Sequence, residues 1–62
     1  MMKKFEIKGE IVEAVSPFYA ALSIGPVKLV GTMTDRKTGQ SIETTWQLHE
    51  TGELFLVKEI EE

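Results

Sequence analysis

The sequence predicts an all-β domain, a five-stranded antiparallel meander that is strongly curved or closed into a small barrel. Apolar and polar residues alternate along most of the chain, as they do in strands with one buried face. Two polar segments, which end in Gly39 and Gly52, separate the alternating runs and suit hairpin loops. Antiparallel pairing across these loops brings the large apolar side chains to one common face.

The first strand is expected from Phe5 onward. Phe5, Ile7 and Ile11 alternate with charged residues and share one face. Gly9 and the adjacent apolar pair Ile11-Val12 interrupt this alternation, which indicates a bend or a bulge. Such a bend would let one long strand curl across the others.

Residues 16–26 carry the signals of a helix. Ser16 and Pro17 stand where an N-cap and a first helical residue belong, and Gly25 stands where a helix would end. This helix would be apolar on nearly every side, however, and would have to be buried all round. A chain of 62 residues offers few layers with which to bury it.

The same segment also fits a strand, which is the interpretation that we prefer. A strand over residues 18–24 that turns through Gly25-Pro26 pairs Leu22 with Leu29, so its large side chains join the common core face. The alternative is an α+β fold in which a short helix over residues 17–24 packs on a four-stranded antiparallel sheet.

The remaining strands place Trp46 at the centre of the core face. A four-residue loop at 36–39 pairs Leu29 with Trp46, and a three-residue loop at 50–52 pairs Trp46 with Leu56. The opposite face then carries an apolar stripe, made up of Ala21, Val30, Phe55 and Val57.

Composition indicates one domain over residues 1–62, since 42% hydrophobic and 27% charged residues are ordinary for a globular protein. The sequence has no cysteine, and hence no disulfide and no thiolate metal ligand. No apolar run approaches the roughly 20 residues of a membrane span. The Met-Met-Lys-Lys start leads into alternating residues and not into the apolar core of a signal peptide. We therefore expect a mature cytoplasmic protein without a membrane segment.

No group of residues predicts catalysis, a metal site or a cofactor. His49 is the one histidine, and beside Glu50 and Glu53 it is more typical of a surface ion pair than of acid–base chemistry. The sequence contains no glycine-rich phosphate loop and no repeated metal-ligand spacing. The protein is therefore expected not to be an enzyme.

The function expected from the sequence is binding. The predicted outer stripe needs a cover, either the curled first strand or a second molecule. We interpret the stripe as the interface of a protein-interacting regulatory module that self-associates as a homodimer, because dimerisation would also support a core of marginal size. The residues of this interface are Ala21, Val30, Phe55 and Val57.

The alternative function is that of a nucleic-acid-binding small β-barrel. Its basic residues would be Lys28, Arg36 and Lys37. A net charge of −3 and the lack of any longer basic run oppose this alternative.

Overall fold

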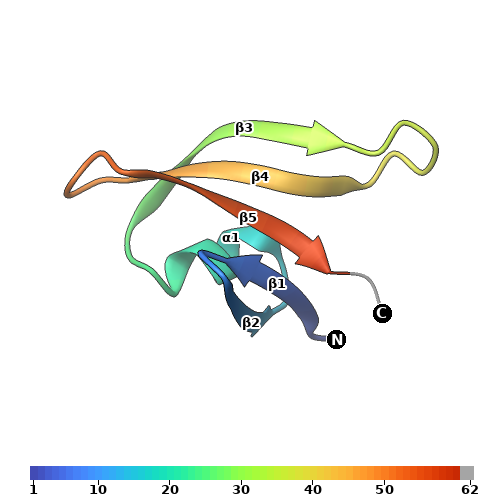
Figure 1. Ribbon diagram of the computed structural model, residues 1–62, viewed down its shortest axis with the longest axis horizontal. Coiled ribbons are helices and arrows are strands. Elements are labelled where there is room, and N and C mark those ends of the chain that lie inside the picture. Colours follow the sequence, from blue (N-terminus) through green and yellow to red (C-terminus); the bar gives the residue numbers. More distant parts are fainter. Residues whose placement is uncertain (61–62) are drawn as a thin grey trace.

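The computed structural model describes residues 1–60 of the chain, in which five strands and one helix are found (Figure 1). In chain order the elements are β1 (Lys3–Ile7), β2 (Glu10–Ala14), α1 (Pro17–Leu22), β3 (Val27–Thr34), β4 (Ser41–Leu48) and β5 (Leu54–Ile60).

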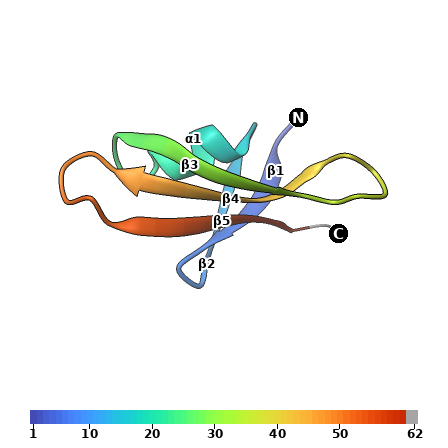
Figure 2. The same cartoon turned by 90° about the horizontal axis from the view of Figure 1, so that it is seen from above.

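The strands form one antiparallel sheet in the order β2-β1-β5-β4-β3, which confirms the predicted five-stranded antiparallel sheet. The sheet is not closed into a barrel, because β2 and β3 lie at its two edges. It is strongly twisted, and Figure 2 shows β1 and β2 crossing the direction of the other three strands steeply.

The first strand of the prediction is two strands in the structure. Lys8 and Gly9 both have positive φ angles, of 51° and 82°, and they join β1 to β2 in a tight hairpin in which Ile7 faces Glu10. Positive φ at both central residues is what a two-residue hairpin turn requires. The expected bend at Gly9 is therefore a complete reversal, and it supplies the fifth strand of the sheet.

The preferred strand over residues 18–24 is wrong, because Pro17–Leu22 form α1. The capping signals prevail: Ser16 is the N-cap, and its Oγ accepts a hydrogen bond from the Tyr19 N–H at 3.4 Å. The helix of the alternative interpretation is thus present, although it ends at Leu22 and its sheet has five strands instead of four.

The turn between β4 and β5 is one residue longer than predicted. Leu48 N–H donates to Glu53 O at 2.9 Å and Gly52 N–H donates to Leu48 O at 2.9 Å, which closes a four-residue loop. Trp46 consequently faces Phe55 and not Leu56. Because side chains alternate along a strand, this shift turns Phe55 towards the core and Leu56 towards the outer face.

The β3–β4 register agrees with the prediction in its first half. Leu29 faces Trp46, as expected, but a bulge after Leu29 shifts the pairing by one residue until a second irregularity after Met33. Met33 therefore lies opposite Glu43 and not opposite Ile42.

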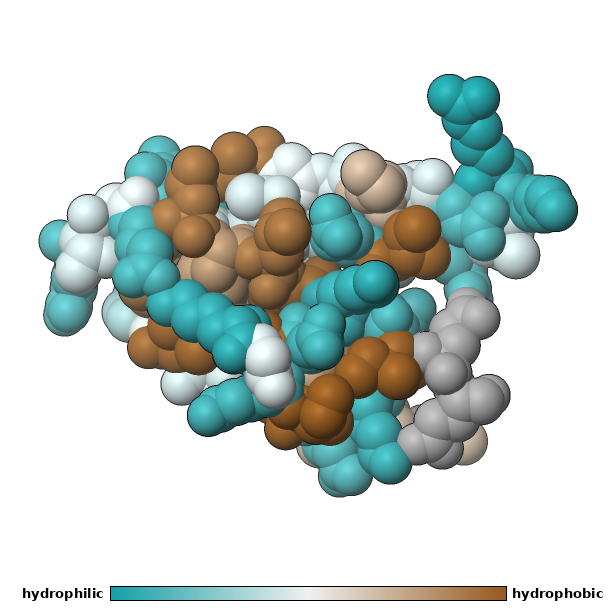
Figure 3. Space-filling model, in the orientation of Figure 1, coloured by the Kyte–Doolittle hydropathy of each residue, from teal (hydrophilic) through white to brown (hydrophobic). Residues whose placement is uncertain are grey.

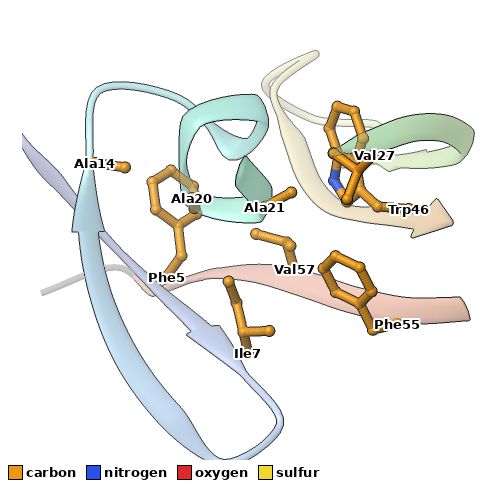
Figure 4. Packing of buried hydrophobic residues seen from close by; sticks show 9 residues of the cluster. All are labelled: Phe5, Ile7, Ala14, Ala20, Ala21, Val27, Trp46, Phe55 and Val57. Carbon is orange, nitrogen blue, oxygen red and sulfur yellow. The ribbon is translucent and has the colours of Figure 1, made fainter. Parts of the chain in front are cut away.

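The core lies between α1 and the face of the sheet that the helix covers, which we call the inner face (Figure 4). Trp46 is buried there, as predicted, and its Nε1 donates a 2.6 Å hydrogen bond to Oγ1 of the buried Thr44. The buried apolar residues are Phe5, Ile7, Ala14, Ala20, Ala21, Val27, Trp46, Phe55 and Val57.

Candidate interaction surface

The predicted outer stripe does not form a surface. Ala21, Phe55 and Val57 are exposed by only 0%, 5% and 1%, because they point into the core (Figure 4). Val30 alone is exposed, and it lies on the edge strand β3. Phe55 and Val57 are buried because of the single-residue shift at the β4–β5 turn, and Ala21 is buried because its segment is helical.

The three basic residues of the alternative function lie at two ends of one hairpin. Lys28 is the second residue of β3, and its partner across the sheet is Gln47. Arg36 and Lys37 belong to the loop beyond the far end of β3, where the Lys37 N–H donates to Asp35 Oδ1 at 2.9 Å. A strand of eight residues spans about 26 Å, so the structure does not gather these side chains into one patch.

His49 lies in the exposed loop after β4, where its backbone N–H donates to Pro26 O at 3.0 Å. Among residues 1–60, no three histidine, cysteine, aspartate or glutamate side chains are grouped closely enough to hold a metal ion. Within the same residues, no helix has the length and apolar character that crossing a membrane requires.

Helix α1 exposes several large apolar side chains. Ala20 and Ala21 are fully buried against the sheet, whereas Phe18, Tyr19 and Leu22 are exposed by 43%, 58% and 39%. A surface helix normally carries polar residues on the side away from the core. None of the six residues of α1 is charged, so this helix presents an apolar side to solvent.

Strand β3 continues this apolar surface. The Phe18 ring lies 5.7 Å from the ring of Trp46 and 5.7 Å from that of Tyr19. Leu29 faces Trp46 across the β3–β4 pair and so shares the inner face with it, yet Leu29 is 54% exposed. Trp46 thus lies beneath the junction of helix and strand. We call the four exposed residues Phe18, Tyr19, Leu22 and Leu29 the helix patch.

The helix patch is free of charge. Residues 14–27 contain no charged side chain, and the nearest charged residues in the sequence are Glu13 and Lys28. Residues 29–34 contain none either. An exposed surface that is both apolar and uncharged is typical of a site that another macromolecule covers.

The outer face of the sheet is different in character. Leu54 and Leu56 are exposed there, at a shallow hollow of about 430 Å³ whose rim carries charges of both signs. Lys58 lies between Glu6 on one neighbouring strand and Glu43 on the other. Figure 3 views the molecule with α1 behind β1, and it shows hydrophobic and hydrophilic residues interspersed. The outer face is therefore a poorer docking surface than the helix patch.

No family model matches this chain, and neither a curated protein nor a solved structure matches it.

Sequence reasoning assigned Phe18, Leu22 and Leu29 to the core and so missed them as surface residues. A signal for them was present in the sequence. The caps at Ser16 and Gly25 predict a helix, and a helix that is apolar on all sides has more apolar surface than one sheet can bury. The side of the helix that the sheet does not bury must then face another layer.

Proposed function

We propose that this protein is a non-enzymatic binding module that self-associates through the helix patch. One observation carries the proposal: α1 has no charged residue and leaves Phe18, Tyr19 and Leu22 exposed. Removing apolar surface from water contributes roughly 25 cal/mol per Å², so covering these side chains is favourable. We propose a cytoplasmic location as well, with which a sequence free of cysteine is compatible.

A second copy of the same chain suits this surface. In a two-fold symmetric dimer the same patch lies on both sides of the contact, so a patch with a net charge would face a patch of the same sign. The uncharged helix patch avoids this repulsion. The core also gains from additional burial, because the largest fully buried side chains among residues 1–60 are Phe5, Ile7 and Val57, which is a small core.

The available area is sufficient for a dimer. The accessible surface is 4507 Å², whereas a compact monomer of this mass is expected to expose about 4,000 Å². With its sequence neighbours Val15 and Ile24, which are also exposed, the helix patch offers on the order of 500 Å² of side-chain surface. Two such surfaces reach the roughly 1,000 Å² at which biological interfaces begin.

Sedimentation equilibrium over a range of protein concentrations tests this proposal. We expect a concentration-dependent dimer for the unmodified chain. The Leu22→Lys substitution should weaken the dimer at least about tenfold, because it places a buried, unpaired charge on each side of the contact. Lysine at the C-terminal end of α1 interacts favourably with the helix dipole, so the monomer should remain folded.

Leu54→Lys is the control, because Leu54 is an exposed leucine on the outer face, at 57% against 39% for Leu22. Its dimer should be as stable as that of the unmodified chain. A strict monomer at all concentrations, or a dimer that Leu54→Lys disrupts and Leu22→Lys does not, would overturn the proposal. Far-UV circular dichroism of each variant verifies that the fold is retained.

The nucleic-acid-binding alternative gains no support from the distances, since Lys28 lies at the opposite end of β3 from Arg36 and Lys37. We therefore carry the self-associating module forward alone.

A further inference from the structure

The sheet is wider than its single helix. Neighbouring strands lie about 4.8 Å apart and a helix is about 10 Å in diameter, so one helix covers two or three strands. Helix α1 packs mainly on β1, β2 and β5. The β3–β4 hairpin runs well beyond it, as Figure 1 shows, and no other helix occurs in residues 1–60.

The inner face of β3 stays uncovered from Leu29 onward, whereas Val27 at the start of the strand is buried. Leu29 and Thr32 lie on this face, opposite Trp46 and Thr44, and both are exposed. Their partners on β4 are buried. The edge of the inner face therefore lacks a cover that would complete the second layer of the fold.

We infer that in the dimer α1 of each protomer lies over the inner face of the partner's β3, in the place that a second helix would occupy. This inference rests on the proposed self-association and specifies its geometry. Each chain contributes a helix that exposes Phe18, Tyr19 and Leu22, and a bare strand that exposes Leu29. Both lie beside Trp46, since the Phe18 ring is 5.7 Å from the Trp46 ring and Leu29 faces Trp46 across the sheet.

A two-fold axis beside Trp46 would cover both the exposed side of α1 and the exposed part of β3 in each protomer. When the helix of one protomer covers the partner's strand, symmetry places the partner's helix on the strand of the first protomer. The dimensions are compatible: a six-residue helix is about 9 Å long, and the strand from Leu29 to Thr34 is about 17 Å long. No charged residue occurs in residues 29–34, so an apolar helix meets no unpaired charge there.

Cross-linking between two single-cysteine variants tests this geometry. Because the sequence contains no cysteine, each variant has a single thiol. The Tyr19→Cys chain, labelled with ¹⁵N, is mixed with the unlabelled Thr32→Cys chain at a concentration that favours the dimer. After mild oxidation, mass spectrometry identifies the mixed covalent dimer. A disulfide requires Cα atoms within about 7 Å, so the mixed product reports that α1 lies next to the partner's β3.

Met33→Cys is the control partner, because Met33 is adjacent to Thr32 but lies opposite Glu43, on the outer face. We expect the Tyr19→Cys and Thr32→Cys mixture to cross-link about tenfold more than the mixture with Met33→Cys. Equal or greater cross-linking with Met33→Cys overturns the inference, as does a lack of cross-linking with Thr32→Cys. If Leu22→Lys still disrupts the dimer in that case, the proposed function stands, whereas a monomeric unmodified chain removes both.

Discussion

The two halves of the sheet use similar residues and differ in what covers them. Under α1, the side chains of Phe5, Ile7 and Val57 are fully buried. On β3 beyond Val27, where the helix does not reach, Leu29 of the same face is more than half exposed. Both halves alternate in polarity as strands do, so the pattern of the strand does not by itself decide which apolar residues form the core.

The size of the helix explains this difference. Ala20 and Ala21 have small side chains, so α1 can lie close to the sheet. They cover the core at Phe5 and Val57 (Figure 4). With six residues, α1 is too short to cover the length of β3 as well. We therefore expect stability of the single chain to reside in the covered half and association to reside in the uncovered half.

Phe5→Ala gives the largest expected effect on stability. Truncating a fully buried phenylalanine typically lowers the free energy of unfolding by about 3–5 kcal/mol, and a domain of this size has little more to lose. Urea denaturation followed by circular dichroism measures the loss. In dilute solution, where the chain is monomeric, the matched Leu29→Ala change should stay within about 0.5 kcal/mol. Comparable losses from both variants would mean that the two halves do not differ as described.

The covered and uncovered halves were not equally predictable from sequence. The position of Trp46 opposite Leu29 followed from the loop after β3 and is confirmed. The register of β5 was missed because Leu54-Phe55-Leu56-Val57 are four consecutive apolar residues. Either phase puts two of them on the core face, so alternation cannot distinguish a three-residue loop from a four-residue loop.

Helix α1 shows the converse case, in which local signals were correct and a global argument overrode them. Ser16 and Pro17 are the N-cap and the first residue of the helix, which ends at Leu22 with Ser23, and not Gly25, near its C-terminal cap. A helix that is apolar all round needs burial on every side, which favours a strand here instead. The structure buries Ala20 and Ala21 alone, and it leaves Phe18, Tyr19 and Leu22 at the surface. These exposed residues belong to the candidate site. The periodicity of a single sequence does not show which side of such a helix stays exposed.

Thr44→Val tests how strictly the covered inner face requires its polar groups to be paired. The buried Trp46 Nε1–H donates to Thr44 Oγ1, and valine has the same shape but no acceptor. An unsatisfied buried donor lowers the free energy of unfolding by about 1–3 kcal/mol. Thr45→Val, at the next residue on the opposite face, should change it by no more than about 0.5 kcal/mol. Equal effects in urea denaturation would show that the indole finds another partner.

Two ion pairs give the smallest expected effects and extend the comparison to charged residues. Lys8 pairs with Glu53 at the exposed end of the β1–β2 hairpin, and about half of each side chain remains exposed. Lys3 Nζ lies 3.2 Å from Oε1 of Glu59, whose side chain is only 13% exposed on the inner face beside Phe5. Exposed pairs typically contribute less than about 1 kcal/mol and are screened by salt, whereas shielded pairs are screened less.

Glu53→Gln should therefore lower the free energy of unfolding slightly at low ionic strength, and the loss should disappear in about 1 M salt, where the Debye length is about 3 Å. Glu59→Gln should give the larger loss, and more of it should persist in salt, because solvent reaches the Glu59 carboxylate less freely even though the Lys3 side chain is 54% exposed. Urea denaturation of both variants at the two ionic strengths measures the difference. If salt abolished both losses equally, the inner face near Phe5 would be as open to solvent as the hairpin end. The charged residues would then not differ between covered and uncovered regions.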